Sequence, residues 1–318
     1  MPRSTNLQHV GRMFGFINVS KPSGKTSRQV VDRVVRCAAG VKAGHAGTLD
    51  PLASGVLVVA VGPATRLIHY VQQMPKRYEA VFLLGRDSPT EDVEGPVVEL
   101  AGSVIPTRDA LDRAAAALTG VIMQRPPAYS ALKVAGRRAY DLARRGEEVA
   151  LTPRPVTIHR LEITHYDYPE MRLAIECSAG TYVRTLGRDL AQRAGTLAVM
   201  SALVRTAVGV FTLANATSAE DITQQGLPIL IQNPLVAFGD WPRLIVSNAE
   251  IARIANGQSI RRPLDATGDL PPAAAGIPHQ ALAVNAAGAL VAVLEHVDAG
   301  PSAESDAWHP RMTFLAGR

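Results

Sequence analysis

Asp50 is the residue whose local sequence most favours chemistry. Gly44 and Gly47 precede it and allow the backbone to turn tightly or to approach a ligand closely. Pro51 follows it and disfavours a helical conformation at Asp50. A carboxylate on such a rigid, non-helical loop can serve as a covalent nucleophile toward an anomeric carbon, as in retaining glycosidases. The alternative is a turn-capping aspartate beside a surface histidine at His45, since aspartate is common in turns.

Other chemistries have weaker support in the sequence. Gly24-Lys25-Thr26 is similar to the end of a P-loop, but Val19 occupies the position where that motif needs its first glycine. No dinucleotide-binding glycine pattern follows a strand, and no serine has the context of a nucleophile elbow. The eight histidines show no spacing typical of metal ligands. A metalloenzyme is therefore not expected.

The charge distribution suggests a polyanionic partner for the N-terminal part of the chain. The net charge of the 318 residues is only +5. Residues 1–50, however, carry eight Lys and Arg against two acidic residues, whereas residues 239–318 carry six arginines against eight acidic residues. A nucleic acid would be steered to the N-terminal two-thirds of the chain. A solvated basic surface is the alternative interpretation.

Two cysteines, Cys37 and Cys177, lie far apart in different sequence contexts, which is typical of a reducing compartment. No apolar run approaches the roughly 18 residues of a membrane span. The N-terminal residues also lack the apolar segment of a signal peptide. We therefore expect a cytoplasmic protein without membrane attachment.

Alternating and β-branched segments predict strands, and helical spacing of apolar residues predicts helices. Ser27 is the expected N-cap of a helix that runs through Val34 and ends at Gly40. Gly180 precedes a segment in which Tyr182 and Arg184, if extended, would share one face. Strands are expected at 15–20, 56–61, 78–84, 156–166 and 172–178, and further helices at 108–119 and around 186–191.

Basic and aromatic side chains alternate between residues 124 and 149, where few residues could form a core face. This composition predicts an exposed basic arm that binds nucleic acid. A surface helix with extended arginines is the alternative. Farther along, residues 233–241 have the composition of a linker. Short apolar strands at 281–284 and 290–294 then predict a small second domain that is mainly β.

The segment Gly44-His-Ala-Gly-Thr-Leu-Asp-Pro-Leu-Ala-Ser-Gly resembles the catalytic motif of the TruB family of pseudouridine synthases, the tRNA pseudouridine-55 synthases. Four further motifs of that family are matched in the family's order with similar separations. They lie at residues 18–27, 76–80, 125–134 with 138–144, and 180–186. Together the matches cover roughly residues 14–210, and five motifs in order are highly specific.

The resemblance implies an α/β (α+β) fold with two domains. Residues 1–241 would form a catalytic domain with a mixed sheet and a central catalytic cleft, and its RNA-gripping insertion would span about 124–150. Residues 242–318 would form a small β-barrel-like, PUA-type RNA-binding domain. The acidic balance of this second domain departs from the composition of a strong RNA binder.

The resemblance also implies three catalytic residues. Asp50 would be the nucleophile that attacks the ribose C1′ or the uracil ring. Arg184 would pair with Asp50 and hold its orientation. Tyr78 would stack on the flipped uracil and take part in removal of the C5 proton. Substrate-binding roles fall by the same resemblance on His45, Tyr182, Lys21, Leu203, Lys133, Arg137 and Arg138.

The implied reaction is the isomerisation of a uridine, at position 55 in the T-loop of tRNA, to pseudouridine. Because the uracil is detached, rotated and rejoined through C5, no cofactor or metal is implied. The implied partner is tRNA, either through its T-arm alone or through its T-arm and acceptor stem, for a monomer that needs no protein partner. A synthase acting on another RNA, such as rRNA, and a non-catalytic tRNA chaperone are the alternatives.

Overall fold

The computed structural model describes residues 13–127, 129, 133–134, 137–138, 151–239, 241–263, 279–297 and 305–315. The chain divides into two compact units, Met1–Gln232 and Asn233–Arg318. The expected linker at 233–241 therefore belongs to the second unit. Its 3-10 helix η4 (Pro234–Phe238) is largely buried, and the ring of Phe238 contacts that of Trp241 edge to face at 5.1 Å.

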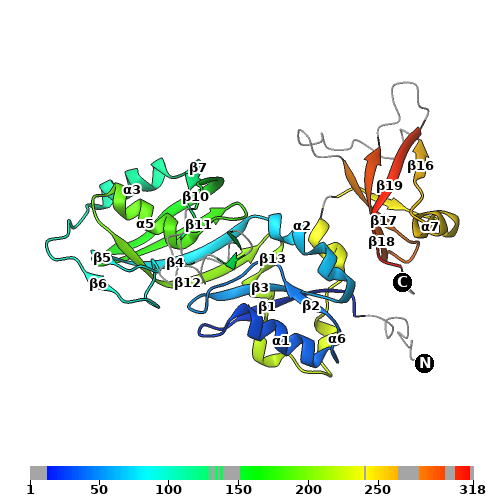
Figure 1. Cartoon of the computed structure of the whole chain (residues 1–318), viewed down its shortest axis with the longest axis horizontal. Helices are drawn as coiled ribbons and strands as arrows, with labels where there is room; N and C mark the ends of the chain where they lie inside the picture. The colour runs from blue at the N-terminus through cyan, green and yellow to red at the C-terminus, as the bar shows by residue number, and fades with distance from the viewer. Residues whose placement is uncertain are drawn as a thin grey trace, which may run out of the picture. The chain divides into compact units, whose positions relative to one another are not determined.

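A ten-stranded mixed sheet forms the centre of the first unit (Figure 1). Most neighbouring strands are antiparallel, but β1 pairs with β14 and β3 pairs with β12 in parallel. The order along the sheet is β14 (Thr217–Ser218), β1 (Gly15–Lys21), β3 (Ser54–Val61), β12 (Ala198–Val208), β4 (Lys76–Leu84), β11 (Glu170–Cys177), β10 (Arg154–Asp167) and β7 (Gly120–Gln124). Outside this path, β2 (Ala43–His45) pairs with β3, and β13 (Phe211–Thr212) pairs with β12.

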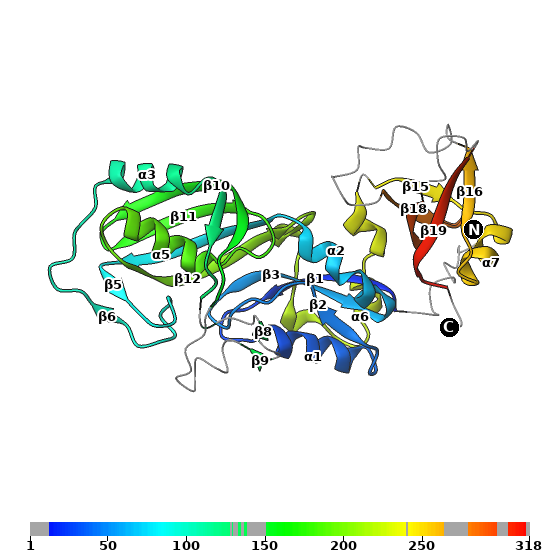
Figure 2. The ribbon, with the colours of Figure 1, turned by 45° about the horizontal axis from the view of Figure 1, so that its top comes forward.

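Helices cover the sheet over two separate apolar cores. Helix α1 (Ser27–Cys37) packs Val30, Val31 and Val34 against side chains of β1 and β3. Helices α3 (Arg108–Ala117) and α5 (Val183–Arg193) pack together against β4, β10, β11 and β12, as Figure 2 shows. The sequence-based strands and helices of this unit are thereby confirmed, with ends that shift by a few residues.

The two halves of the sheet meet where β3 and β12 pair through only two residue pairs, Val204 with Ser54 and Arg205 with Gly55. Gly55 has a φ of +99°, and a Cβ added there would lie 2.3 Å from the carbonyl oxygen of Arg205. Glycine is therefore required for the strands to approach this closely. The loop that carries Asp50 ends at this junction.

Remaining short elements connect these strands. In chain order they are η1 (Gly62–Leu67), α2 (Ile68–Gln73), β5 (Arg86–Asp87), β6 (Val98–Glu99), η2 (Leu213–Asn215), η3 (Ala219–Asp221) and α6 (Leu227–Leu230). Strands β8 (Lys133–Val134) and β9 (Arg137–Arg138) pair only with each other, with Lys133 opposite Arg138. The rest of the expected basic arm, apart from 124–127 and residue 129, lies outside the described residues.

The expected N-cap at Ser27 is wrong. Thr26 caps α1 in a capping box with Gln29, and Ser27 is the first helical residue. Ser27 instead turns inward, where its hydroxyl donates to the carbonyl oxygen of Leu49 at 3.0 Å and accepts from the Leu49 N–H at 2.9 Å. The adjacent Thr and Ser are equivalent in type, and only tertiary contact assigns one to the cap and the other to the core.

The expected extended conformation between Tyr182 and Arg184 is also wrong. Strand β11 ends at Cys177, Tyr182 is the N-cap of α5, and Arg184 lies in its first turn. Residues two apart in a helix point about 200° around the axis from each other rather than to one face. Tyr182 and Arg184 nevertheless line the same pocket, because Tyr182 precedes the helix.

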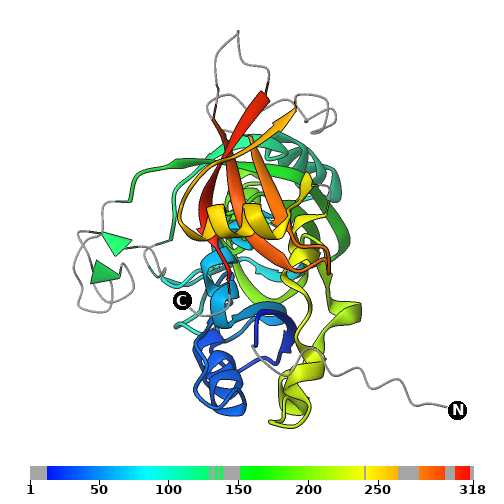
Figure 3. The ribbon, with the colours of Figure 1, turned by 90° about the vertical axis from the view of Figure 1, so that its right-hand side faces the viewer.

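The second unit is a curled five-stranded sheet of PUA-like form (Figure 3). Its order is β15 (Arg243–Ile245), β17 (Gln280–Val284), β18 (Leu290–Val297), β19 (Ser305–Thr313) and β16 (Ile260–Pro263). Helix α7 (Asn248–Ala255) begins with a capping box between Ser247 and Glu250. Trp308 and Ile254 are fully buried in its core. The expected small, mainly β domain is confirmed, while residues 264–278 of its expected loop lie outside the described residues.

No helix in the described residues of either unit is long and apolar enough to cross a membrane.

Ser27 and Ser23 both bind the backbone of the loop that carries Asp50, and replacing each serine tests how it anchors the loop. Ser27→Ala removes a buried hydroxyl and leaves the N–H and carbonyl of Leu49 without that partner. We expect a loss of about 1–3 kcal/mol in the free energy of unfolding, measured by urea titration. Ser23→Ala removes the exposed bond to the Leu52 carbonyl and should cost less than about 0.5 kcal/mol. Equal effects of the two substitutions would contradict the inward role of Ser27.

Candidate active site

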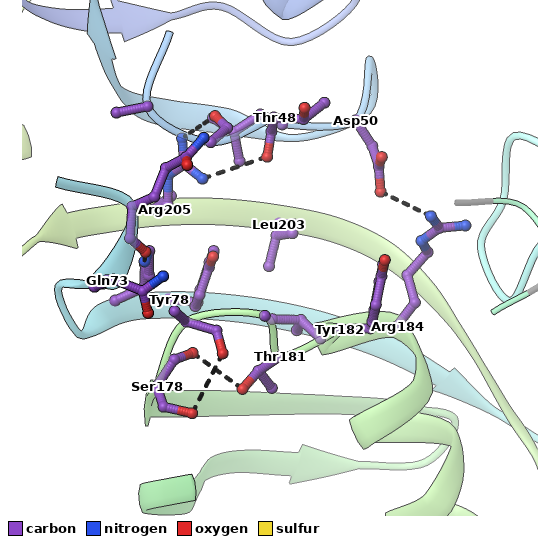
Figure 4. A pocket seen from close by; sticks show the side chains of 18 of the residues that line it. Thr48, Asp50, Gln73, Tyr78, Ser178, Thr181, Tyr182, Arg184, Leu203 and Arg205 are labelled. Carbon is purple, nitrogen blue, oxygen red and sulfur yellow. Dashed lines mark hydrogen bonds and ion pairs between the residues drawn. The ribbon is translucent and has the colours of Figure 1, made fainter. Parts of the chain in front are cut away.

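A cavity of about 580 Å³ opens beside the junction of β3 and β12. Its walls come from the loop before β3, from strands β4 and β12, from the end of α2, and from the segment that leads into α5 (Figure 4). Five of the residues expected from sequence line it: Asp50, Tyr78, Tyr182, Arg184 and Leu203. Residues separated by more than 150 positions in the sequence are thus brought to one cavity.

Arg184 lies between two carboxylates. Its Nη2 is 3.1 Å from Oδ2 of Asp50, and its Nη1 is 3.3 Å from Oδ2 of Asp92. The side chains of Arg184 and Asp92 are 7% and 4% exposed, whereas that of Asp50 is 37% exposed. Asp50 is therefore the carboxylate that a ligand can reach, and Asp92 is the buried one.

Two carbonyl oxygens complete the environment of the Arg184 guanidinium. Nη1 donates to the carbonyl of Thr90 at 2.7 Å, and Nη2 donates to the carbonyl of Tyr129 at 3.0 Å. A side chain held by this many acceptors has little freedom to rotate. The guanidinium therefore fixes the direction of the Asp50 carboxylate at the wall of the cavity, as the dashed line in Figure 4 shows.

Tyr78 and Leu203 form the apolar part of the cavity. They lie on the neighbouring strands β4 and β12, and their side chains are at most 9% exposed. Burial raises the pKa of the Tyr78 phenol, so the hydroxyl is protonated at neutral pH. A neutral ring beside an aliphatic side chain can hold a flat, uncharged heterocycle.

Tyr182 lines the cavity and is held in place through its backbone and through its ring. The side-chain amide of Gln124 accepts from the Tyr182 N–H at 2.8 Å and donates to the Tyr182 carbonyl at 3.0 Å. The guanidinium of Arg154 lies 5.2 Å from the centre of the Tyr182 ring and also donates to the carbonyl of Gly180 at 2.6 Å. These contacts favour one orientation of the ring.

Lys21 supports the loop that carries Asp50 and is not among the residues that line the cavity. Its fully buried side chain donates to the carbonyl oxygens of Pro22 at 3.0 Å, Lys25 at 2.5 Å and Pro51 at 3.3 Å. Burial lowers the pKa of Lys21 to about 8. The bond to Pro51 ties the residue after Asp50 to the end of β1.

His45 lies at the end of β2, half-buried and next to the cavity rather than in its lining. Burial, helped by the nearby charge of Arg205, lowers the pKa of the imidazole. Its Nδ1 is buried without a hydrogen-bond partner. The lowered pKa favours the neutral form of the imidazole at neutral pH.

Two residues of the site were not singled out from the sequence. Asp92 stands in a turn-like segment where an aspartate has no distinctive signal. Arg205 could have been found, because it lies two residues after Leu203 on a strand and shares its face.

Arg205 braces the loop on the side away from Arg184. Its side chain is buried and donates from Nε to the carbonyl of Val56 at 2.8 Å, from Nη2 to that of Gly47 at 3.1 Å and from Nη1 to that of Thr48 at 3.4 Å. The positive charge of Arg205 also offsets part of the rise that burial causes in the pKa of Tyr78. One guanidinium thus joins β12 to the backbone on both sides of Asp50.

Only the backbone of Lys133, Arg137 and Arg138 is described, so the substrate-binding roles expected of their side chains stay predictions. Among the described residues, no group of three or more His, Cys, Asp or Glu side chains could hold a metal ion. Both thiols, of Cys37 and Cys177, are free, and burial raises the pKa of Cys177 to about 11.

The fold defines the class of protein. The chain is similar to a solved chain from the crystal structure of a Cbf5-Nop10-Gar1 complex, with a TM-score of 0.71, 24% identity, and coverage of 95% of this chain and 85% of that one. A second chain, from the structure of an H/ACA RNP bound to a substrate RNA containing 2′-deoxyuridine, gives a TM-score of 0.69 at 22% identity, with coverage of 95% and 86%. The mixed sheet with its C-terminal unit is therefore the architecture of the Cbf5 proteins.

Residues 34–183 match the family model described as TruB family pseudouridylate synthase (N terminal domain). A protein of Arthrobacter sp. (strain FB24), named tRNA pseudouridine synthase B, is 42% identical over 278 residues, which cover 82% of this chain and 88% of that protein. The protein of the same name from Paenarthrobacter aurescens (strain TC1) is 41% identical over 309 residues, which cover 95% and 96%. The chain belongs to the TruB family of pseudouridylate synthases.

The fork geometry of Arg205 predicts a specific effect of its replacement by lysine. A single ammonium cannot reach the carbonyls of Gly47, Thr48 and Val56 together as the guanidinium does. Arg205→Lys should leave the loop misplaced and lower the single-turnover rate on saturating substrate about 10- to 100-fold. RNA affinity, measured by filter binding, should change much less. Arg172→Lys, on the exposed face of β11, is the matched control. Equal rates for both variants would contradict a bracing role for Arg205.

Proposed function

We propose that this chain isomerises a uridine in tRNA to pseudouridine, at position 55 of the T-loop. The observation that carries the proposal is the accessible carboxylate of Asp50, held by the buried Arg184 at the wall of a cavity with an aromatic and an aliphatic side. Membership of a family of pseudouridylate synthases, and relatives named for tRNA, support the reaction and the substrate.

In this reaction Asp50 is the nucleophile, attacking either C1′ of the ribose or the uracil ring. The N1–C1′ bond breaks, the uracil rotates, a C5–C1′ bond forms, and the covalent bond to Asp50 breaks again. The hydrogen on C5 leaves as a proton and N1 takes up a proton, so the reaction is an isomerisation. Arg184 orients the carboxylate, and Tyr78 and Leu203 hold the base between them. The raised pKa of Tyr78 favours stacking by the neutral phenol over proton removal by a phenolate.

The uridine must leave its RNA stack to reach Asp50, which costs a few kcal/mol. The cavity volume of about 580 Å³ suits one extruded nucleotide. His45 would then fill the vacated space in the RNA. Its lowered pKa and unpaired Nδ1 support that role, since a neutral imidazole stacks on bases with little loss of solvation.

Binding of tRNA would follow the distribution of charge. We assign the T-arm to the first unit, as the catalytic domain, with the basic arm at about 124–150 and its Lys133, Arg137 and Arg138 in contact with phosphates. The second unit would act as a PUA-type domain that makes weak contact with the acceptor stem, because residues 239–318 are net acidic. The protein would act in the cytoplasm as a monomer.

A pure tRNA chaperone and an rRNA-specific synthase are less well supported. Binding alone does not require an acidic side chain that faces RNA phosphate, and Asp50 is both acidic and accessible. Relatives that match over most of their length are named for tRNA rather than rRNA.

Replacement of the nucleophile tests the reaction directly. Asp50→Asn should abolish pseudouridine formation and leave tRNA affinity within about threefold, because the carboxylate takes part in chemistry rather than in binding. Tritium release from tRNA labelled at uridine C5 measures the first quantity, and filter binding measures the second. Asp112→Asn, on the exposed face of α3, is the control and should keep full activity. Turnover by pure Asp50→Asn protein would refute the assignment.

The basic arm can be tested through the salt dependence of binding. Replacing both Arg137 and Arg138 by glutamine should weaken tRNA binding and reduce the log–log slope against salt by up to about two. The single-turnover rate at saturation should change much less. Replacing Arg160 and Arg172, which pair with acidic neighbours on β10 and β11, by glutamine provides the control. A slope that stays the same in the arm variant would mean that these arginines do not contact phosphate.

A further inference from the structure

Glu91 has an unusual backbone and a buried carboxylate. Its φ is +61°, and among the described residues only one other non-glycine residue, Ala39, has a positive φ. A side chain with a Cβ adopts this region at a cost in free energy. The residue is 7% exposed, although glutamate is seldom buried without partners. Surrounding contacts must therefore maintain both features.

The carboxylate of Glu91 holds the first turns of α5. Its Oε2 accepts from the Thr185 hydroxyl at 2.8 Å, and its Oε1 accepts from Nη1 of Arg188 at 2.9 Å. Thr185 directly follows Arg184, and Arg188 lies one turn farther along the same helix. Glu91 itself is not among the residues that line the cavity.

The backbone of Glu91 is tied to strand β12. Its carbonyl accepts from the N–H of Met200 at 3.0 Å. Two residues farther on, the N–H of Val93 donates to the Met200 carbonyl at 3.1 Å. The residues on either side of Glu91 both contact Arg184, through the carbonyl of Thr90 and the carboxylate of Asp92. The segment 90–92 therefore connects β12 to the catalytic arginine.

Helix α5 needs such support at its N-terminus. Its N-cap, Tyr182, makes no side-chain capping bond, and its first turn contains no acidic residue. The same turn carries the positive charge of Arg184, which the helix dipole disfavours at this end. Acidic groups near a helix N-terminus are stabilising, and here Glu91 and Asp92 provide them from another part of the chain.

We propose that Glu91 is a positioning residue: by binding Thr185 and Arg188 it fixes the first turn of α5, and so directs Arg184 toward Asp50. The left-handed backbone at Glu91 is the means by which Thr90, Glu91 and Asp92 all reach α5 from one short turn. The inference rests on the proposed function for its kinetic test, but the anchoring of α5 can be measured without activity.

Three substitutions at this position separate the backbone from the carboxylate. Glycine and asparagine both tolerate a positive φ, but neither reaches Thr185 and Arg188. Glutamine keeps the length, and its amide can serve both partners because the threonine hydroxyl can accept as well as donate. Ala39→Gly, at the other strained position, controls for relief of strain alone.

We expect Glu91→Gly and Glu91→Asn to lower the single-turnover rate on saturating tRNA about 10-fold or more, with tRNA affinity within about threefold. Glu91→Gln should recover the rate to within about threefold of the unsubstituted protein. Combining Glu91→Asn with Thr185→Val should cost little more than Glu91→Asn alone, because Glu91→Asn already removes the bond to Thr185. Ala39→Gly should leave the rate unchanged.

Hydrogen exchange provides the second measurement. The amides of the first turn of α5 should exchange faster in Glu91→Asn than in the unsubstituted protein, while those of α1 and α3 stay protected. If Glu91→Asn folds, reacts at the full rate and leaves α5 protected, the inference is wrong. The inference is also wrong if Glu91→Asn lowers the single-turnover rate, the tRNA affinity and the protection of all helices alike, and Glu91→Gln does not restore them. Glu91 would then be merely structural. If the unsubstituted protein is inactive on tRNA but exchange in α5 is still faster in Glu91→Asn, the proposed function is refuted and the anchoring of α5 by Glu91 is upheld.

Discussion

A buried cation at the unfavourable end of a helix determines most of this active site. Arg184 lies in the first turn of α5, almost without solvent, where the helix dipole and desolvation both oppose its charge. Two carboxylates and two backbone carbonyls compensate for that cost. Because Asp50 is one of the two carboxylates, the same contacts that stabilise the arginine also fix the direction of the reactive group.

The loop that carries Asp50 is held by buried polar side chains as well as by the packing of Leu49 and Ala53 in the core. Ser27 binds Leu49 from α1, Lys21 binds the carbonyl of Pro51 from β1, and Arg205 binds Gly47 and Thr48 from β12. Each of these polar contacts reaches a backbone group of the loop. Rigidity of this kind keeps a nucleophile near its productive geometry.

The distribution of rigid and solvent-accessible parts agrees with a base-flipping reaction. The cavity is lined on one part by the charged side chains of Asp50, Arg184 and Arg205, and on another by Tyr78, Leu203 and Tyr182. The polar network therefore positions the Asp50 carboxylate, and under the proposed function rings and an aliphatic side chain are left to receive the base. The second unit has its own core around Trp308, and every residue proposed for catalysis lies in the first unit.

The sequence by itself determined the strands, the main helices, the family and five of the residues that line the cavity, because these depend on local periodicity and on motifs of adjacent residues. It misassigned Ser27 and the conformation from Tyr182 to Arg184, because neighbouring residues of similar propensity compete for the same local role. Asp92 and Glu91 carry no distinctive local signal, and Arg205 carries only its spacing of two residues from Leu203. Only the tertiary structure decided their partners, since burial of a charge acquires meaning from the groups that surround it in space.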